Sequence, residues 1–270
     1  MPEMTADLVI AGAAGLMLAG RWHLADELLT AAAAESERDQ AALALARAGL
    51  AVDWDMWCGG QDVTQVIETA APLVAQARDA VAAFDLDLLR LRAGYWAELV
   101  PPDGTPPRFG PQGRDLVILE SLAAQAQRLQ AAAPDRGRAG WAAFWGGVIA
   151  DNLREEHHAA VDLFAEALTA GEQSGDDMLT AEALRHLGYV ASQDGDPDTA
   201  RGQWTRSAEL RQRAGSVPGA LSQQVMLAGL ARDAGDTAAA RALAAEVHRW
   251  AAALGITRLQ SQADQIASAS

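Results

Sequence analysis

The chain has 270 residues, of which 50% are apolar, so it contains enough apolar side chains for a sizeable core. Its formal net charge of −15, from 36 acidic and 21 basic residues without a Lys/Arg cluster, argues against nucleic-acid and anionic-membrane partners. No stretch reaches the roughly 18 apolar residues of a membrane span, and the acidic N-terminus lacks the basic region of a signal peptide. We therefore expect a cytoplasmic protein.

The composition favours helix over strand. Alanine and leucine dominate, only 5% of the residues are aromatic, and the β-branched runs that form strands are nearly absent. The single cysteine, Cys58, excludes an internal disulfide framework and a cysteine-based zinc site. The expectation is an all-α protein without a metal or a cofactor.

Apolar residues at three- and four-residue spacing predict six antiparallel helix pairs. The first helices are expected near 4–18, 38–58, 81–100, 138–153, 178–193 and 218–233. Their partners are expected near 22–36, 62–79, 114–132, 157–172, 198–213 and 237–253, and a capping helix near 256–268. Pro72 lies inside the second partner helix and predicts a kink or a restart there.

The two helices of a pair are separated by short breaks that recur along the chain. They stand at Gly20, Gly60, Glu155, Gly195 and Gly235, so three of the four gaps are 40 residues. A glycine at the end of a helix permits a left-handed cap, and an aspartate after it can accept backbone N–H groups at the start of the next helix. This regular spacing is typical of a helical repeat.

The long gap contains a Pro/Gly-rich segment at 101–113, which has five of the ten prolines. Loops of this length in compact domains are usually functional or disordered. The segment lacks the Gly-Lys-Ser/Thr of a phosphate-binding loop. Because neighbouring repeats bury each other's apolar faces, we expect residues 1–270 to form a single domain with 101–113 as an insertion.

The fifth pair has the residues by which the chain resembles a known family. Leu187, Gly188, Ala200 and Trp204 match the large, small, small and large positions of tetratricopeptide repeats. The forty-residue units also resemble the helical sensor regions of bacterial transcription regulators of the LuxR and antibiotic-regulatory-protein types. The resemblance implies a right-handed superhelical solenoid of about six helix pairs with a C-terminal capping helix, and it specifies fold better than function.

In that family the first helix of each pair lines a concave groove. This geometry places in the groove Trp54, Trp57, Tyr95, Glu98, Trp145, Asn152, Arg185, Tyr189 and Gln193. The tryptophans have two interpretations: filler between repeats, because large apolar residues usually lie inside, or the wall of a ligand pocket. Likewise, Arg185 can pair with a carboxylate of a ligand or with one of the chain's own acidic side chains.

The sequence has no catalytic motif for zinc peptidases, serine hydrolases or dinucleotide-dependent enzymes. His157 and His158 are adjacent, so in a helix they point about 100° apart and cannot hold one ion together. The candidates for proton transfer are Glu98 and Asp151, because a carboxylate near tryptophan in a partly dry pocket can act as a general acid or base.

Three functions remain open. The leading hypothesis is a non-catalytic binding protein whose aromatic groove takes a small hydrophobic ligand or a peptide segment. The second is an enzyme that performs acid/base chemistry, such as a cyclisation or isomerisation, on a hydrophobic metabolite. The third is a protein–protein scaffold, which predicts exposed apolar patches.

Overall fold

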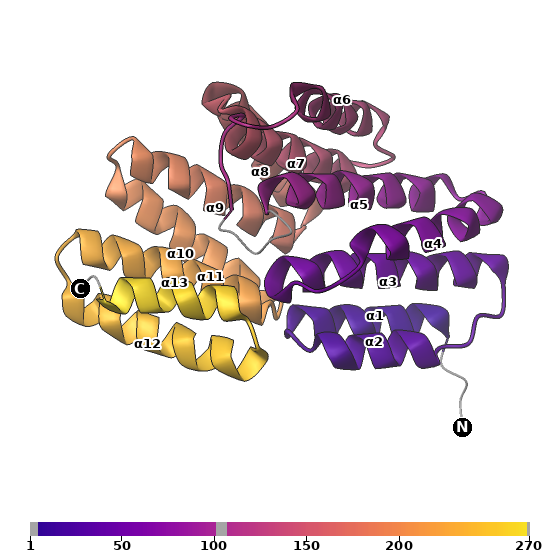
Figure 1. Ribbon diagram of the computed structural model, residues 1–270, viewed down its shortest axis with the longest axis horizontal. Coiled ribbons are helices and arrows are strands. Elements are labelled where there is room, and N and C mark those ends of the chain that lie inside the picture. The colour runs from indigo at the N-terminus through magenta and orange to yellow at the C-terminus, as the bar shows by residue number, and fades with distance from the viewer. Residues whose placement is uncertain (1–4, 101–106, 269–270) are drawn as a thin grey trace.

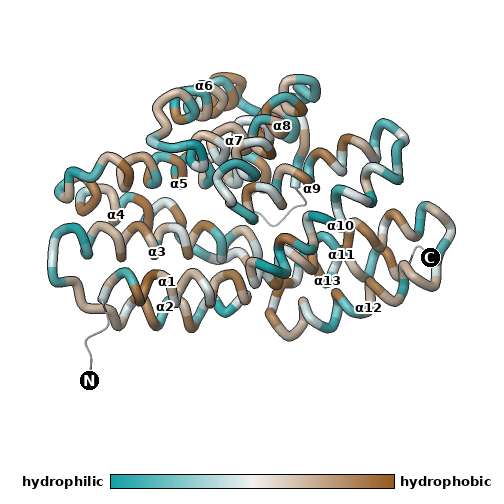
Figure 2. Tube along the Cα trace, turned by 180° about the vertical axis from the view of Figure 1, so that it is seen from behind, coloured by the Kyte–Doolittle hydropathy of each residue, from teal (hydrophilic) through white to brown (hydrophobic). Residues whose placement is uncertain are grey.

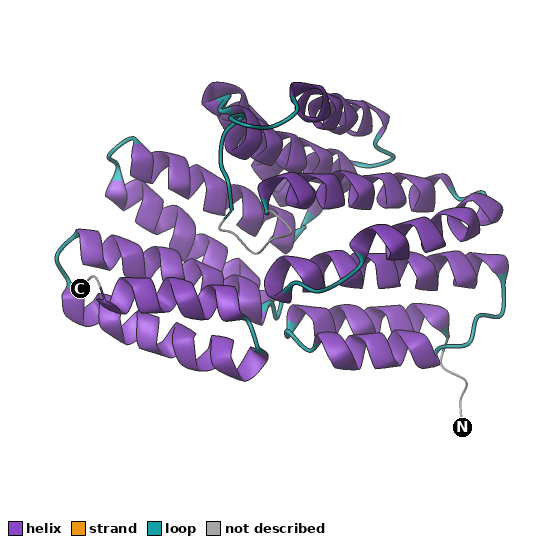
Figure 3. Ribbon diagram, viewed as in Figure 1, coloured by secondary structure: helices purple, strands orange, loops and turns teal. Residues whose placement is uncertain are grey.

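The computed structural model describes residues 5–100 and 107–268, and these ranges contain 13 α-helices and no strand (Figures 1 and 3). In chain order the helices are α1 (Ala6–Leu18), α2 (Trp22–Ala31), α3 (Glu37–Cys58), α4 (Val63–Ala77), α5 (Ala80–Leu99), α6 (Leu116–Ala132), α7 (Arg136–Arg154), α8 (His157–Ser174), α9 (Asp177–Gln193), α10 (Pro197–Arg213), α11 (Val217–Asp233), α12 (Thr237–Leu254) and α13 (Thr257–Ser268). The predicted all-α solenoid of six helix pairs with a final capping helix is confirmed, because each helix packs on its neighbours along the chain.

The predicted breaks form the turns between paired helices. Gly195 takes the left-handed conformation with a φ of 79°, and Asp196 then accepts the backbone N–H of Thr199 at 3.0 Å. Asp236 caps α12 in the same way, at 3.0 Å from the nitrogen of Ala239. Glu155 adopts the left-handed conformation at the break without a glycine, with a φ of 58°.

The structure contradicts two details of the predicted helices, namely a restart at Pro72, which was one of two alternatives, and the end of the helix expected near 22–36. Helix α4 runs unbroken from Val63 to Ala77, so Pro72 causes no restart. Pro72 is exposed, whereas the apolar face of α4 with Ile67 and Val74 is buried, and packing of that face maintains the helix. Helix α2 ends at Ala31 rather than near residue 36, because the chain becomes extended at Ala32.

Close packing within the fifth pair depends on Gly188 and Trp204. A Cβ atom at Gly188 would lie only 2.5 Å from the indole nitrogen of Trp204. That nitrogen donates a hydrogen bond of 2.9 Å to the backbone carbonyl of Arg185. The small and large residues therefore let α9 and α10 approach closely, and the indole holds the pair in register.

The solenoid curves until its two ends meet. Figure 1 shows α10–α13 end to end with α1–α3, and Figure 2 shows the same arrangement from behind. Helix α13 contacts α3, and Trp57 and Cys58 pack against the apolar cluster of α11–α13. At Gly20 a Cβ atom would lie 3.3 Å from the ring of Pro218, so the α1–α2 turn lies against α11. The first helices thus surround a central space.

Across the described ranges, no helix is long and apolar enough to cross a membrane.

Candidate central cavity

A cavity of about 2260 Å³, here called the central cavity, lies inside the curve of the solenoid. Its wall comes mainly from α3, α5, α7, α9, α11 and α13, with contributions from α1, α2, α4, α8 and α10. Five of the eight tryptophans line it, namely Trp22, Trp57, Trp96, Trp141 and Trp145. The closure between α13 and α3 makes this space a chamber with contributions from both ends of the chain.

The apolar part of the wall is a run of touching aromatic rings on α5 and α7. The ring of Tyr95 lies 5.0 Å from that of Trp96 and 5.5 Å from that of Trp145, between centroids. Phe144 continues the run, with its ring 5.3 Å from Trp145 and 5.8 Å from Trp141. These distances are typical of edge-to-face aromatic packing, which makes a rigid apolar surface.

Polar groups converge where α5, α7, α9 and α13 face one another. Tyr95, only 2% exposed, accepts a hydrogen bond of 2.6 Å from the side-chain amide of Asn152. Burial raises the pKa of Tyr95, against the charges of Arg185 and Arg258, so the phenol stays protonated. Arg258 lies over the ring of Trp96, 5.5 Å from its centroid.

Two ion pairs also belong to the wall. Arg211 of α10 pairs with Glu182 of α9 at 2.8 Å, and its side chain is almost fully buried. Burial, the largest single cause, raises the pKa of Glu182, but the charge and hydrogen bond of Arg211 together with the charge of Arg185 lower it overall. Arg92 of α5 forms an ion pair with Asp53 of α3 and lies over the ring of Trp145, 5.4 Å from its centroid.

His186 of α9 is held among aromatic rings at the edge of the cavity. Its ring lies 4.7 Å from that of Phe164 and 5.4 Å from that of Phe144. Burial, followed by the charge of Arg185, lowers the pKa of His186 to about 3. The imidazole is therefore neutral near pH 7 and packs as an aromatic ring.

The structure brings together six of the residues predicted for the groove. The cavity is lined by Trp57, Tyr95, Trp145, Asn152, Arg185 and Tyr189. Asp151, one of the proton-transfer candidates, lines it as well. The two interpretations of the tryptophans overlap, because Trp145 both belongs to the largest apolar core cluster and forms cavity wall.

Three predicted residues do not line the cavity. Trp54 packs edge-on against His23, with ring centroids 4.5 Å apart, inside the apolar cluster of α1–α3. Glu98 lies 3.7 Å from Arg114 in an ion pair, and Gln193 is exposed at the last residue of α9. Three residues along a helix rotate a side chain by about 60°, so Trp54 and Trp57 meet different surroundings.

Sequence reasoning missed the contribution of α13. Arg258 enters the cavity wall and donates a hydrogen bond of 3.4 Å to the carbonyl of Met56, which is 202 residues away. Its helix was expected only to cap the stack, and no local pattern distinguishes Arg258 from other surface arginines. Glu182 and Arg211 were missed because their pairing is formed across two helices.

The two candidates for catalysis, Asp151 and Glu98, lie in different surroundings. Asp151 is within 2.8 Å of Nδ1 of His157, whose side chain is largely exposed. Glu98 faces Arg114 outside the cavity. Within the described residues, no group of three or more His, Cys, Asp or Glu side chains could hold a metal ion.

The inserted segment at 101–113 falls partly outside the described residues, which resume at Pro107. Its described part joins the cavity, because Pro107, Phe109 and Gly110 form wall. The backbone N–H of Gly110 donates to the carbonyl of Asn152 at 2.8 Å. Arg114 donates to the backbone carbonyls of Glu98 and Gly110, which holds the segment beside α5 and α7.

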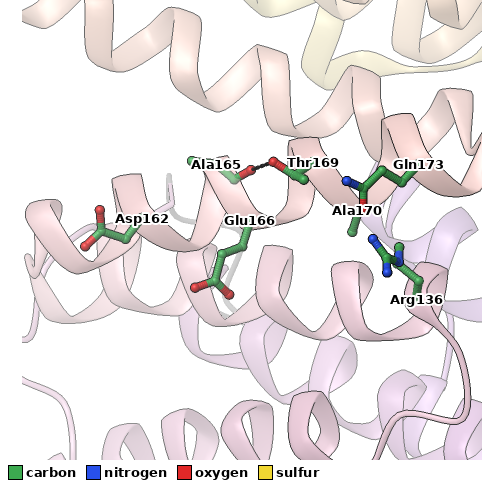
Figure 4. Close-up of a pocket in the computed structure, with 7 residues that line it drawn as sticks. All are labelled: Arg136, Asp162, Ala165, Glu166, Thr169, Ala170 and Gln173. Carbon is green, nitrogen blue, oxygen red and sulfur yellow. Dashed lines mark hydrogen bonds between the residues drawn. The ribbon is translucent and has the colours of Figure 1, made fainter.

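A second depression of about 570 Å³ lies on the outer side of α8 (Figure 4). It is lined by Arg136, Asp162, Ala165, Glu166, Thr169, Ala170 and Gln173. Thr169 donates its hydroxyl to the backbone carbonyl of Ala165, as Figure 4 shows. The wall contains no aromatic ring, so the central cavity is the stronger candidate site.

Comparison of the sequence with protein-family models finds no match, and no curated protein matches it either. The fold and the cavity therefore define only a class: an all-α solenoid closed around an aromatic chamber.

Proposed function

We propose that this chain is a non-catalytic binding protein of the tetratricopeptide-like class, whose central cavity takes a small hydrophobic molecule or a peptide segment. The observation that supports this proposal most is the gathering of five of the eight tryptophans around one cavity. Aromatic walls with a few convergent polar groups are the usual composition of a ligand site.

The size of the cavity bears on the ligand. Its 2260 Å³ exceed the roughly 300–1,000 Å³ typical of small-molecule pockets, so a bulky or elongated ligand fits it better than a small one. A peptide segment would pass along the first helices, whereas a small molecule would occupy the part where α5, α7, α9 and α13 converge.

Binding fits the chemistry of the wall better than catalysis. Tyr95 and His186 have pKa values moved away from neutrality, by burial in both cases. General acids and bases work best with pKa values near the working pH, so neither group suits proton transfer. Asp151 remains the candidate residue for the alternative of an enzyme, because it reaches the cavity and has His157 as a partner.

The test is a titration with pyrenebutanol, a neutral fluorescent alcohol with a flat apolar body, followed by energy transfer from tryptophan. We expect saturable binding that Trp96→Leu weakens by roughly three- to tenfold through loss of an aromatic contact. The matched control is Trp54→Leu, because Trp54 lies outside the cavity. Binding that does not saturate, or that both variants affect equally, argues against the proposal.

One observation favours a scaffold as a second candidate. Leu116, Val117 and Ile118 at the start of α6 are consecutive and all exposed, at 60%, 72% and 43%. Exposed apolar runs of this kind usually mark a contact surface. A scaffold predicts a stable protein complex that Val117→Asp abolishes and Trp96→Leu leaves intact, whereas binding of a partner in the cavity predicts the opposite pattern.

A further inference from the structure

Positive charge is concentrated on one side of the central cavity. Arg185 of α9, Arg211 of α10 and Arg258 of α13 all line it, although the whole chain has a net charge of −15. Burial and the like charges of Arg211 and Arg258 lower the pKa of Arg185, and burial lowers that of Arg258. Holding these guanidinium groups together is therefore electrostatically unfavourable in the free protein.

Within residues 5–100 and 107–268, no carboxylate is bonded to two of the three arginines. Glu182, which acts electrostatically on Arg185, forms its ion pair with Arg211 instead. Among the described residues the side chain of Arg185 makes no hydrogen bond or ion pair, and its Nε atom is covered from solvent without an acceptor. In the part of the chain that the structure describes, the side chain of Arg258 donates only to the carbonyl of Met56, at 3.4 Å.

A paired arginine in the same cavity provides the contrast. Arg92 is bonded to Asp53, so its charge is already compensated. A buried cation without a partner costs free energy, and proteins usually supply a counter-charge. Arg185 and Arg258 are partly buried and have no bonded carboxylate, with Glu182 acting on Arg185 only from a distance, so both can still bond an anion in the cavity.

The phenol of Tyr95 adds a neutral donor to the same place. Its oxygen accepts the hydrogen bond from Asn152, and no described residue accepts the hydrogen of its own hydroxyl. Arg258 lies over the ring of Trp96, which touches the ring of Tyr95, and Arg185 lines the same cavity. An oxyanion at this point would receive one neutral and two charged donors, an arrangement suited to carboxylate recognition.

The balance of charge selects the kind of anion. The whole cavity wall has seven acidic residues and five arginines, so positive charge exceeds negative charge only locally, where Arg185 and Arg258 have no bonded carboxylate and Glu182 is bonded to Arg211. In a wall with this many acids, a singly charged carboxylate adds less negative charge than a phosphate monoester near pH 7 does. The aromatic wall of Trp96 and Trp145 lies beside the polar groups, because Tyr95 touches both rings.

We propose that Arg185, Arg258 and Tyr95 form a subsite for the single carboxylate of a small molecule whose flat apolar body packs against Trp96 and Trp145. This inference rests on the proposed function and specifies the chemical class of the ligand.

The experiment compares pyrenebutyrate with pyrenebutanol, which share a ring system and differ in the carboxylate. In the unaltered protein we expect pyrenebutyrate to bind roughly tenfold more tightly or better, the range for hydrogen bonds to a charged group. Arg185→Met is expected to abolish this preference, because it weakens the binding of pyrenebutyrate more than that of pyrenebutanol. Arg185→Lys should retain part of the preference, because it keeps the charge without the planar fork.

The matched control is Arg213→Met, because Arg213 is exposed on α10 and pairs with Asp177 outside the cavity. Arg213→Met should leave the affinities for pyrenebutyrate and for pyrenebutanol unchanged. If Arg185→Met fails to fold by circular dichroism, Arg258→Met provides the same readout from another helix. A preference that persists in whichever of these two variants folds overturns the subsite.

The outcomes separate the subsite from the proposed function. Equal binding of the acid and the alcohol overturns the subsite and leaves the binding function standing. A further arm uses an apolar peptide with a free or an amidated C-terminus. If only the free-acid peptide binds, and Arg185→Met abolishes that binding, the ligand is a peptide and the small-molecule assignment is wrong. No binding of any of these probes overturns both proposals.

Discussion

The guanidinium carbon of Arg258 lies 5.5 Å from the ring centroid of Trp96, so the last helix of the chain touches a helix of the third pair. The same side chain reaches the carbonyl of Met56 on α3. This contact closes the solenoid, because α13 then bridges α3 and α5. A repeat protein usually has contacts only between neighbouring units, and the closure gives this one a chamber instead of an open groove.

Replacing Arg258 should loosen that closure. In Arg258→Met we expect a loss of about 0.5–2 kcal/mol of unfolding free energy from the cation–π contact. Amide hydrogen exchange should become faster in α13 and at the end of α3. The control is Arg249→Met, because Arg249 pairs with Glu246 on the exposed side of α12. Equal exchange rates in both variants would show that α13 is held by its apolar face alone.

The close approach of α9 and α10 predicts opposite effects at two glycines. In Gly188→Ala the new methyl group meets the indole of Trp204, and overpacking of this kind costs about 1–3 kcal/mol. In Gly229→Ala, in the interior of α11, the methyl group meets no atom within 4 Å, so we expect a gain of up to about 1 kcal/mol. Urea denaturation measures both, and destabilisation of similar size in the two variants would contradict the packing argument.

His186 predicts a dependence of stability on pH. The unfolded chain takes up a proton near pH 6.5, whereas the folded chain takes it up only near pH 3, so the unfolded state binds more protons between these values. The free energy of unfolding therefore falls as the pH falls through this window, by up to about 1.4 kcal/mol per pH unit. His186→Leu should reduce the decrease in unfolding free energy between pH 7 and pH 5. His158→Leu, at an exposed position, should leave that decrease unchanged. Identical pH profiles would refute this role of His186.

The hydrogen bonds of Arg114 are expected to protect the segment beside the cavity from proteases. Its side chain is 2% exposed and donates at 2.9 Å to the carbonyl of Glu98. Arg114→Gln removes a charged donor, which costs about 1.5–3 kcal/mol. We expect faster thermolysin cleavage before Phe109, which is exposed in the intact protein. Arg128→Gln, on the exposed face of α6, is the control, and equal cleavage rates would mean that other contacts hold the segment.

Local features of the sequence determined the helices and the turns of this protein. The break at Gly195 and Asp196 was predictable, because a left-handed glycine and a capping aspartate act on the backbone within a few residues. Gly188 and Trp204 were recognisable as a small–large pair through the resemblance to tetratricopeptide repeats, and they do pack against each other in adjacent helices of one repeat.

The tertiary structure alone decided which side chains share the cavity. Trp54 and Trp57 stand three residues apart, yet only Trp57 lines it, because the cavity contact depends on how α3 is rotated against its neighbours. Arg258 reaches the cavity only because the curvature accumulated over all the helix pairs returns α13 to α3. That curvature is a sum of small rotations between units, each set by side-chain packing, and no short stretch of sequence specifies the sum.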